Sequence, residues 1–177
     1  MSQLTDRMIR AARLEVALYE EVEADTSALQ QAMMVVIASS VAAGIGAVAT
    51  GGVIGIVKGT LGALLGWYVW AFITYFVGTR VLPQPQTRAD TGELLRTIGF
   101  SSSPGVLRIF GFIPVLGPVI ALVASLWMLV AMVIAVRQTL DYTSTLRAVG
   151  VCIIGWFVMA LIMIVVGGAA GMMGLGR

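Results

Sequence analysis

The sequence predicts an all-α protein, a polytopic bundle of membrane-spanning helices preceded by an amphipathic N-terminal helix. Of its 177 residues, 59% are hydrophobic and only 11% are charged, and the mean hydropathy is +0.97. A soluble domain carries about 25% charged residues. Several apolar runs also exceed the roughly 18 residues that indicate a spanning helix. We therefore expect the lipid bilayer to be the main surroundings of this chain.

The composition excludes several kinds of site. The sequence contains no histidine, which rules out His-ligated haem and zinc as well as Ser-His and Cys-His catalytic pairs. The single Cys152 permits no intramolecular disulfide. Ten arginines and one lysine are scattered rather than gathered into a basic face, so we expect no nucleic-acid partner. We likewise expect no catalytic residue, no cofactor and no metal.

Residues 1–28 are predicted to form a cytoplasmic segment with an amphipathic helix over residues 4–24. At helical spacing, one side carries Leu4, Met8, Ala11, Leu18 and Val22, and the other carries Arg7, Arg10 and Arg13. The helix either lies on the membrane surface, packs on a partner, or docks on the protein's own membrane domain.

An acidic segment, Glu20, Glu21, Glu23 and Asp25, ends this N-terminal region. Grouped carboxylates serve acid–base chemistry or bind cations in some proteins. Here no second acidic cluster completes such a site, which favours a solvated segment at the membrane interface. Its negative charge also suits the start of the following helix.

Residues 29–177 are predicted to form the membrane domain. The expected spanning helices cover about 29–50, 60–79, 96–112, 118–136 and 148–167. A polar connector follows Arg80, in which prolines disfavour helix, and Asp90 or Thr91 is expected to cap a short helix after it.

Glycines recur at helical spacing around the start of the second spanning helix: Gly51, Gly55, Gly59, Gly62 and Gly66. Small residues at this spacing let helix backbones approach closely. The stripe therefore predicts a helix-packing surface, either within the chain or between copies in a homo-oligomer. A role in a pore or substrate path is a third alternative.

The stretch "RIFGFIPVLGPVIALVASLW" (residues 108–127) interrupts an apolar region with two prolines. Arg108, Pro114, Gly117 and Pro118 make it the candidate functional region of the membrane domain. Either "IPVLGP" is a turn between a short third helix and the fourth, which gives five spans, or the stretch is a re-entrant or interfacial helix, which leaves four. Arg108 is a functional-site candidate, with snorkelling to the surface as the alternative.

The arginines favour five spans, because short cytoplasmic loops are enriched in Lys and Arg. With the N-terminus inside and five spans, eight of these cations are cytoplasmic and two, Lys58 and Arg177, are outside; four spans give eight against three. The compact loop between Arg137 and Arg147 is also of the cytoplasmic type.

These segments, in this order, resemble the Yip1 domain family in one of its bacterial branches. The resemblance rests on "LYEEV" before the first span, on the Gly-rich first hairpin, and on "RTIGFSSSPGVLRIFGFIPVLGPVIALVASLWMLVAMVIAVRQTL" at residues 96–140. It implies five spans, a cytoplasmic N-terminus and no catalysis. Eukaryotic members associate with Rab GTPases and with each other in Golgi and endoplasmic-reticulum membranes. This chain lacks their "DLYGP"-type motif and long cytosolic arm, so the GTPase role does not carry over.

We therefore expect a non-catalytic protein of the bacterial cytoplasmic (inner) membrane that binds or organises membrane protein partners or the bilayer. An accessory subunit of a membrane complex and a homo-oligomer both belong to this class. The alternative is a small transporter, channel or lipid scramblase that uses the broken segment from Arg108 to Pro118. A water-filled cavity that reaches Arg108 would favour the alternative.

Overall fold

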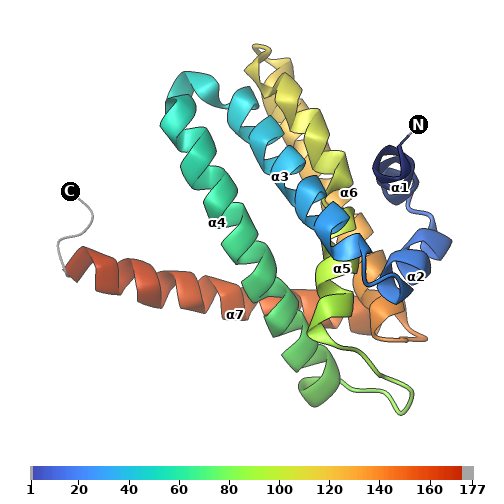
Figure 1. The fold of residues 1–177 in the computed structure, drawn as a ribbon. Coiled ribbons are helices and arrows are strands. Elements are labelled where there is room, and N and C mark those ends of the chain that lie inside the picture. The colour runs from blue at the N-terminus through green and yellow to red at the C-terminus, as the bar shows by residue number, and fades with distance from the viewer. Residues whose placement is uncertain (1, 173–177) are drawn as a thin grey trace.

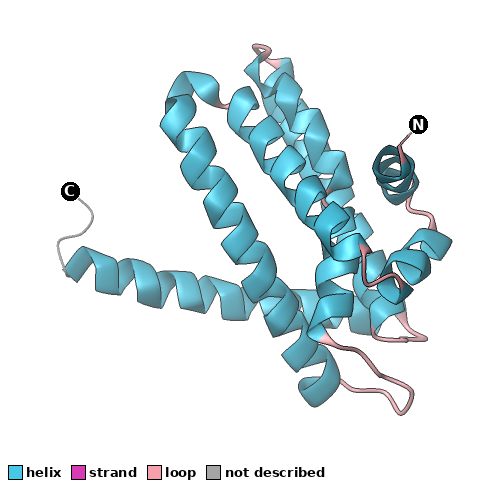
Figure 2. Ribbon diagram, viewed as in Figure 1, coloured by secondary structure: helices cyan, strands magenta, loops and turns pink. Residues whose placement is uncertain are grey.

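A computed structural model describes residues 2–172, and all regular elements in that range are helices (Figures 1 and 2). They are α1 (Gln3–Ala12), α2 (Val16–Ala24), α3 (Ala28–Gly46), α4 (Val48–Phe76), the π-helix η1 (Val77–Val81), α5 (Thr91–Ser101), the 3₁₀-helix η2 (Ser103–Phe112), α6 (Leu116–Thr139) and α7 (Thr145–Met172). Figure 1 shows α3, α4 and α6 running lengthwise, α1 and α2 on one flank of the bundle, and α7 running across the others.

Four of these helices are long and apolar enough to cross a membrane. They are Ala28–Gly46, Gly51–Val81, Leu116–Thr139 and Thr145–Val166. The predicted all-helical membrane fold is thus confirmed, with four spanning candidates among the described residues.

The predicted third span is divided in the structure into α5 and η2. Asp90 begins α5 with a capping box, in which Asp90 Oδ1 accepts from the Glu93 amide at 2.8 Å and Glu93 Oε2 accepts from the Asp90 amide at 2.8 Å. The α-helix ends at Ser101, just before Pro104, which has no amide hydrogen to donate. A single helix over residues 96–112 is therefore replaced by an α-helix and a 3₁₀-helix.

The α5–η2 segment packs along the whole of α3. Close contacts pair Gly99 with Ala32, Gly105 with Ser39 and Gly111 with Gly46, so the two segments run in the same direction. A Cβ on Gly99 or Gly105 would come within 3 Å of an α3 atom, and one on Gly111 would lie 3.2 Å from Gly46 Cα. Glycine is what permits this approach.

The polar ends of several elements meet at the α2 end of the bundle. Arg96 on α5 donates to the main-chain oxygen of Val22 at 2.9 Å and also to that of Glu23, which satisfies carbonyls at the end of α2. Gln138 at the end of α6 donates to Glu20 at 3.2 Å, and Arg147 at the start of α7 donates to the Pro83 carbonyl at 2.9 Å. This end therefore carries the N-terminal region, the polar connector and the α6–α7 loop.

The N-terminal region forms two helices rather than one over residues 4–24. Leu14 breaks the helix with φ of 61°. The five apolar residues expected on one side nevertheless pack into one cluster with Ala32, Val35 and Phe100. Trp127 on α6 also donates its indole N–H to the Ala12 carbonyl at 2.8 Å, so α1 and α2 are docked on the membrane domain.

The second spanning helix begins earlier than expected. Its first turns, from Val48, include most of the segment that we expected to connect two helices, and Gly52 (φ +58°) kinks the chain there. At its other end α4 crosses α7, where Gly155 lies 3.3 Å, measured from an ideal Cβ position, from the Trp70 ring. The last predicted helix, 148–167, likewise begins earlier, at Thr145.

Candidate functional site

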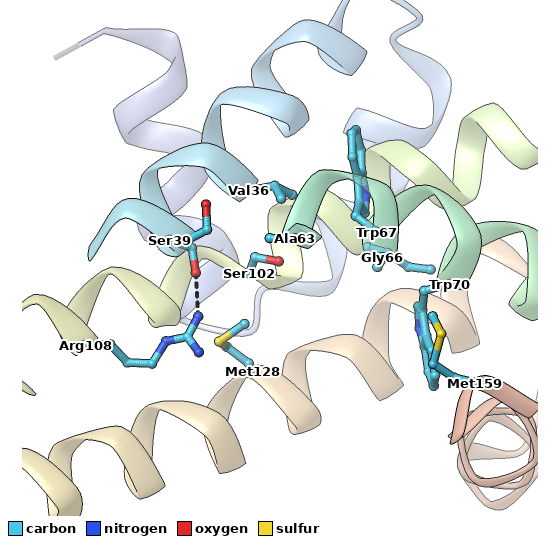
Figure 3. A pocket seen from close by; sticks show the side chains of 12 residues that line it. Val36, Ser39, Ala63, Gly66, Trp67, Trp70, Ser102, Arg108, Met128 and Met159 are labelled. Atoms are coloured by element: carbon cyan, nitrogen blue, oxygen red, sulfur yellow. Dashed lines mark hydrogen bonds between the residues drawn. The ribbon is translucent and has the colours of Figure 1, made fainter. Parts of the chain in front are cut away.

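A cavity of about 290 Å³ lies between α3, α4, α5, η2, α6 and α7 (Figure 3). Its lining consists of apolar side chains with a few hydroxyl and cationic groups: Val36, Ser39, Ser40, Ala63, Gly66, Trp67, Trp70, Ile98, Ser102, Arg108, Met128 and Met159. Figure 3 shows Arg108, Ser39 and Met128 at one end and Trp70 with Met159 at the other. The cavity therefore has a cationic end and an apolar end.

The 3₁₀-helix η2 directs Arg108 into this cavity. Its Nη2 donates to Ser39 Oγ at 3.1 Å, and its Nε lies 3.3 Å from the Gly105 carbonyl oxygen. No carboxylate among residues 2–172 forms an ion pair with it. A half-buried cation without a counter-charge is costly in an apolar environment, which marks it as a functional-site candidate.

Arg108 lies deep along the bundle. Its partner Ser39 follows the start of α3 by 11 residues, which is about 16 Å along a helix axis and about half of a bilayer's hydrocarbon thickness. The guanidinium points toward the middle of α3. Snorkelling of Arg108 to the membrane surface stays an alternative prediction.

Other polar groups of the cavity also lack partners. The Ser102 hydroxyl forms no hydrogen bond within the described chain, whereas Ser40 donates to the Ile37 carbonyl at 2.9 Å. The indole N–H of Trp70 is fully buried without an acceptor there, whereas that of Trp67 donates to the Leu95 carbonyl at 3.0 Å. Buried donors without partners are uncommon and call for a ligand or water.

The cavity offers donors but no acid–base pair. The serines that line it have no histidine, lysine or carboxylate among the lining residues to act as a base. Within residues 2–172, no three His, Cys, Asp or Glu side chains come together in a way that could hold a metal. The arrangement is therefore suited to binding rather than to nucleophilic catalysis.

The other residues of the predicted functional region lie away from the cavity. Pro114 is in the turn before α6, where Val115 has φ of 68°, and Pro118 is in the first turn of α6, where its missing N–H has no intrahelical acceptor. Gly117 packs closely on Gly111, where a Cβ would overlap the Gly111 carbonyl oxygen. These three residues shape the turn, and only Arg108 reaches the cavity.

The glycine stripe makes no close packing contact within the described chain. At Gly51, Gly55, Gly59, Gly62 and Gly66, a Cβ would meet nothing within 4 Å. The glycines of the stripe are therefore not in close contact with another helix of the described chain. Packing of the stripe between copies in a homo-oligomer stays a prediction.

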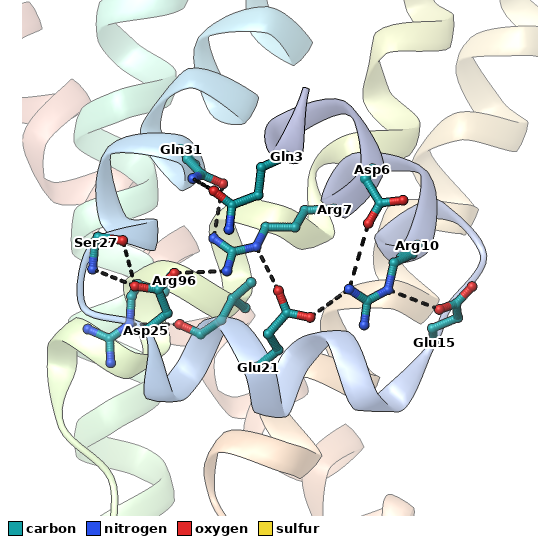
Figure 4. Close-up of polar contacts among 11 residues, drawn as sticks. Gln3, Asp6, Arg7, Arg10, Glu15, Glu21, Asp25, Ser27, Gln31 and Arg96 are labelled. Carbon is teal, nitrogen blue, oxygen red and sulfur yellow. Dashed lines mark hydrogen bonds and ion pairs between the residues drawn. The ribbon is translucent and has the colours of Figure 1, made fainter. Parts of the chain in front are cut away.

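The acidic segment is engaged with the N-terminal arginines (Figure 4). Glu21 accepts from Arg7 at 2.9 Å and from Arg10 at 2.6 Å, and Asp25 accepts from Arg7 at 2.8 Å. These partners lower the pKa of Glu21, chiefly through the hydrogen bond from Arg10. Two of the four acids therefore hold α1 against α2 and the start of α3.

An apolar groove of about 860 Å³ lies between α6 and α7. It is lined mainly by aliphatic and aromatic side chains, among them Leu129, Val133, Ile153 and Trp156.

A comparison with models of known protein families shows which family the chain belongs to. The Yip1 domain model matches residues 19–167 of this chain, from the end of the N-terminal region through most of α7. The chain belongs to the Yip1 domain family. Neither the search of curated proteins nor that of solved structures found a match.

The Yip1 domain match confirms the resemblance seen in "LYEEV" and in residues 96–140. It begins at Tyr19 and so includes α3 to α6 and the Arg108 cavity, but excludes α1. The sequence had pointed to Arg108. It did not indicate that Met128 and Met159, from α6 and α7, would line a cavity with it, because no local pattern links these helices.

Proposed function

We propose that this Yip1 domain protein is a non-catalytic integral membrane protein that binds and organises other membrane proteins, as an accessory subunit or a homo-oligomer. The observation that carries the proposal is a pair of exposed apolar surfaces that the rest of the described chain does not cover. One lies on the first half of α4, whose other face packs on α3, and the second lies on α7 from Trp156 to Val166. The two helices diverge from the point where they cross (Figure 1).

The first half of α4 combines apolar exposure with the glycine stripe. Val53 is 73% exposed and Ile54 is 70% exposed, and the neighbouring glycines face open space. Lipid tails can cover apolar side chains, but they gain nothing from a row of missing side chains. Such a row is suited to the close approach of another helix.

The part of α7 from Trp156 to Val166 is largely exposed in the single chain. Trp156, Phe157 and Ile164 are each more than 70% exposed, and the same holds in lesser degree for Leu161, Met163, Val165 and Val166. A helix that leaves its own bundle in this way has room to bury its surface against a partner in the membrane.

The packing of α5–η2 supports five membrane crossings. This segment runs beside α3 from Ala32 to Gly46, so a bilayer that α3 crosses is crossed by α5–η2 as well. The N-terminal helices, the polar connector and the α6–α7 loop then share one side, which carries most of the arginines and is proposed to be cytoplasmic. We place the protein in the bacterial cytoplasmic membrane, in line with the resemblance to a bacterial branch, with α1 and α2 as its amphipathic N-terminal part.

Cysteine crosslinking in native membranes tests the partner proposal. In a Cys152→Ala background, Gly55→Cys and Gly59→Cys place thiols on the stripe, and Leu122→Cys places one on an exposed, glycine-free face of α6. We expect oxidation or a bifunctional maleimide to give crosslinked products at the stripe but not at position 122. The mass of each product distinguishes a second copy from another protein. Equal crosslinking at all three positions, or none at the stripe, would contradict the proposal.

A bulky residue on the glycine stripe gives a second test of the partner proposal. Because nothing lies within 4 Å of Gly59, Gly59→Ile should leave the single chain folded while it blocks a close-packed partner. We expect the crosslink at position 55 to be lost in this variant, with unchanged helical content by circular dichroism.

The cavity at Arg108 supports a second candidate function, a small transporter, channel or lipid scramblase. A cationic cavity along the bundle is what such a path requires, although no acid lies within the four spanning candidates to couple transport to protons. Flux or lipid-scrambling assays in liposomes, with wild type against Arg108→Gln, test this function directly.

A further inference from the structure

We propose that the cavity at Arg108 binds a phosphate group, either of a phospholipid headgroup or of free phosphate. The proposal does not rest on the partner-organising function and holds whether or not a lipid is moved. It rests on the geometry of the cationic end of the cavity, which nothing in the single chain neutralises.

The guanidinium has unused hydrogen-bonding capacity. Of its five N–H groups, the structure uses those directed to Ser39 and Gly105, and both acceptors are neutral. A guanidinium binds phosphate with paired, charge-assisted hydrogen bonds, and these are the strongest bonds that it makes. A phosphate in the cavity would therefore supply both the missing charge and the missing acceptors.

The neighbouring polar groups are donors as well. Ser39 accepts from Arg108, so its own hydroxyl hydrogen remains available, and the Ser102 hydroxyl has no partner in the described chain. The lining contains no carboxylate. A set of donors with a single cation selects an anion with several acceptor oxygens.

The size and the lining of the cavity limit the kinds of ligand that it can hold. At about 290 Å³ it is at the lower end of small-molecule pockets, which suits a headgroup or a free anion rather than a whole lipid. Its other walls, including Val36, Ala63 and Met128, are apolar and suit the adjoining carbon atoms of a lipid. Phosphate diesters are also the anions that a bilayer itself supplies.

Binding measurements on the full-length protein in a non-ionic detergent test this site. The probes are dioctanoyl phosphatidylglycerol, dioctanoylglycerol, which has the same chains without the phosphate, and inorganic phosphate as a competitor. Arg108→Gln removes the guanidinium, and Arg88→Gln is the matched control because Arg88 is exposed in the connector and the charge change is the same. Circular dichroism and thermal unfolding check that each variant is folded.

We expect phosphatidylglycerol to bind about tenfold more weakly to Arg108→Gln, as for the loss of a charge-assisted hydrogen-bonded pair, and unchanged to Arg88→Gln. Competition by inorganic phosphate would identify a site open to free phosphate, and lack of competition would identify a lipid headgroup site. If Arg108→Gln does not fold, the double variant Ser39→Ala, Ser102→Ala removes only hydroxyls and should weaken binding several-fold.

Equal binding of phosphatidylglycerol to the folded wild type and variants would overturn the proposal. Equal binding of dioctanoylglycerol and phosphatidylglycerol to the wild type would also overturn it. Either result would leave the crosslinks at Gly55 and Gly59 unaffected, so the two proposals fail separately.

Discussion

Arg7 on α1 donates its Nε to the carboxylate of Glu21 on α2 at 2.9 Å, and the Arg7 side chain is only 3% exposed. The same guanidinium donates to Asp25 at 2.8 Å and to Gln31 on α3 at 3.1 Å (Figure 4). One buried side chain thus joins three helices. Desolvation by burial opposes its charge, but the hydrogen bonds that it donates to Asp25 and Glu21 outweigh that effect and raise the pKa of Arg7.

Arg7→Gln should loosen the N-terminal helices from the membrane domain. The change breaks bonds to two partly exposed carboxylates, so we expect a loss of about 1–3 kcal/mol in the docking free energy. Limited proteolysis near Leu14, where the helix is broken, measures this docking. Arg13→Gln is the control, because Arg13 is exposed and its side chain forms no hydrogen bond or ion pair within the described chain. Equal cleavage rates in the two variants would show that the buried arginine does not hold α1 in place.

Stability should fall as the pH rises from about 4.5 to about 7, because of Glu23. Burial, with smaller contributions from the nearby carboxylates of Glu93, Asp141 and Glu20, raises the pKa of Glu23 to about 7 against the opposing charge of Arg96. The folded state therefore keeps a proton in this range that the unfolded state has released, so folding is favoured at the acidic end.

Glu23→Gln should remove this pH dependence. Relative to the variant, we expect the wild type to lose about 1–3 kcal/mol of stability between pH 5 and pH 8, with solvent screening favouring the lower figure. Thermal unfolding in detergent at both pH values measures the difference. Parallel pH profiles for the two proteins would disprove the assignment to Glu23.

The opposite dependence is expected at more acidic pH. Hydrogen bonds from Ser27 and then Arg7 lower the pKa of Asp25 to about 2. Its stabilising contribution is present above about pH 4 and is lost as the pH falls toward 2. Asp25→Asn should therefore flatten the acid limb of the unfolding profile, and an unchanged acid limb would assign that loss of stability to other carboxylates.

Substitution by alanine should change the stability of the protein differently at Gly105 and at Gly59. A Cβ on Gly105 would overlap Ser39 Oγ and crowd the sulfur of Met128, so we expect Gly105→Ala to destabilise the protein by about 1–3 kcal/mol. Gly59→Ala adds a methyl group in open space on a helix and should leave stability equal or slightly higher. Unfolding in a detergent series measures both. A destabilising Gly59→Ala in the monomer would mean that the stripe packs within the chain after all.

With five crossings, the start of α6 lies outside the cell and its end lies in the cytoplasm. In a Cys152→Ala background, Leu116→Cys at the start of α6 should react with an impermeant maleimide from outside, whereas Asp141→Cys in the α6–α7 loop should be protected. Permeabilised cells should label at both positions, as a control for reactivity. External labelling at Asp141 would instead support four spans and a re-entrant segment.

Much of the fold could be predicted because membrane helices are encoded locally. Apolar runs, the capping residues at Asp90 and the proline-containing turn before α6 are each properties of a short stretch. The break between α5 and η2 at Ser102 and Pro104 was harder to predict from the sequence, because a proline can either kink a helix or end it. The continuation of α4 through the glycine-rich stretch was missed because glycine weakens the helical signal.

The candidate site was predicted only in part. Arg108 was identified because a cation in an apolar run is costly wherever it lies. Its partner Ser39 is 69 residues away in the sequence, and Met128 comes from a third element, so their meeting depends on how helices pack.

The sequence by itself determined that this chain is a helical membrane protein of the Yip1 domain family, because hydropathy and local motifs carry that information. Only the tertiary structure decided which charges are neutralised and which are not. Arg7 and Arg108 are both arginines on short helices, yet one meets two carboxylates and the other none. That difference arises from helix packing, which brings α2 against α1 and leaves a cavity beside η2, and packing depends on contacts between residues far apart in the chain.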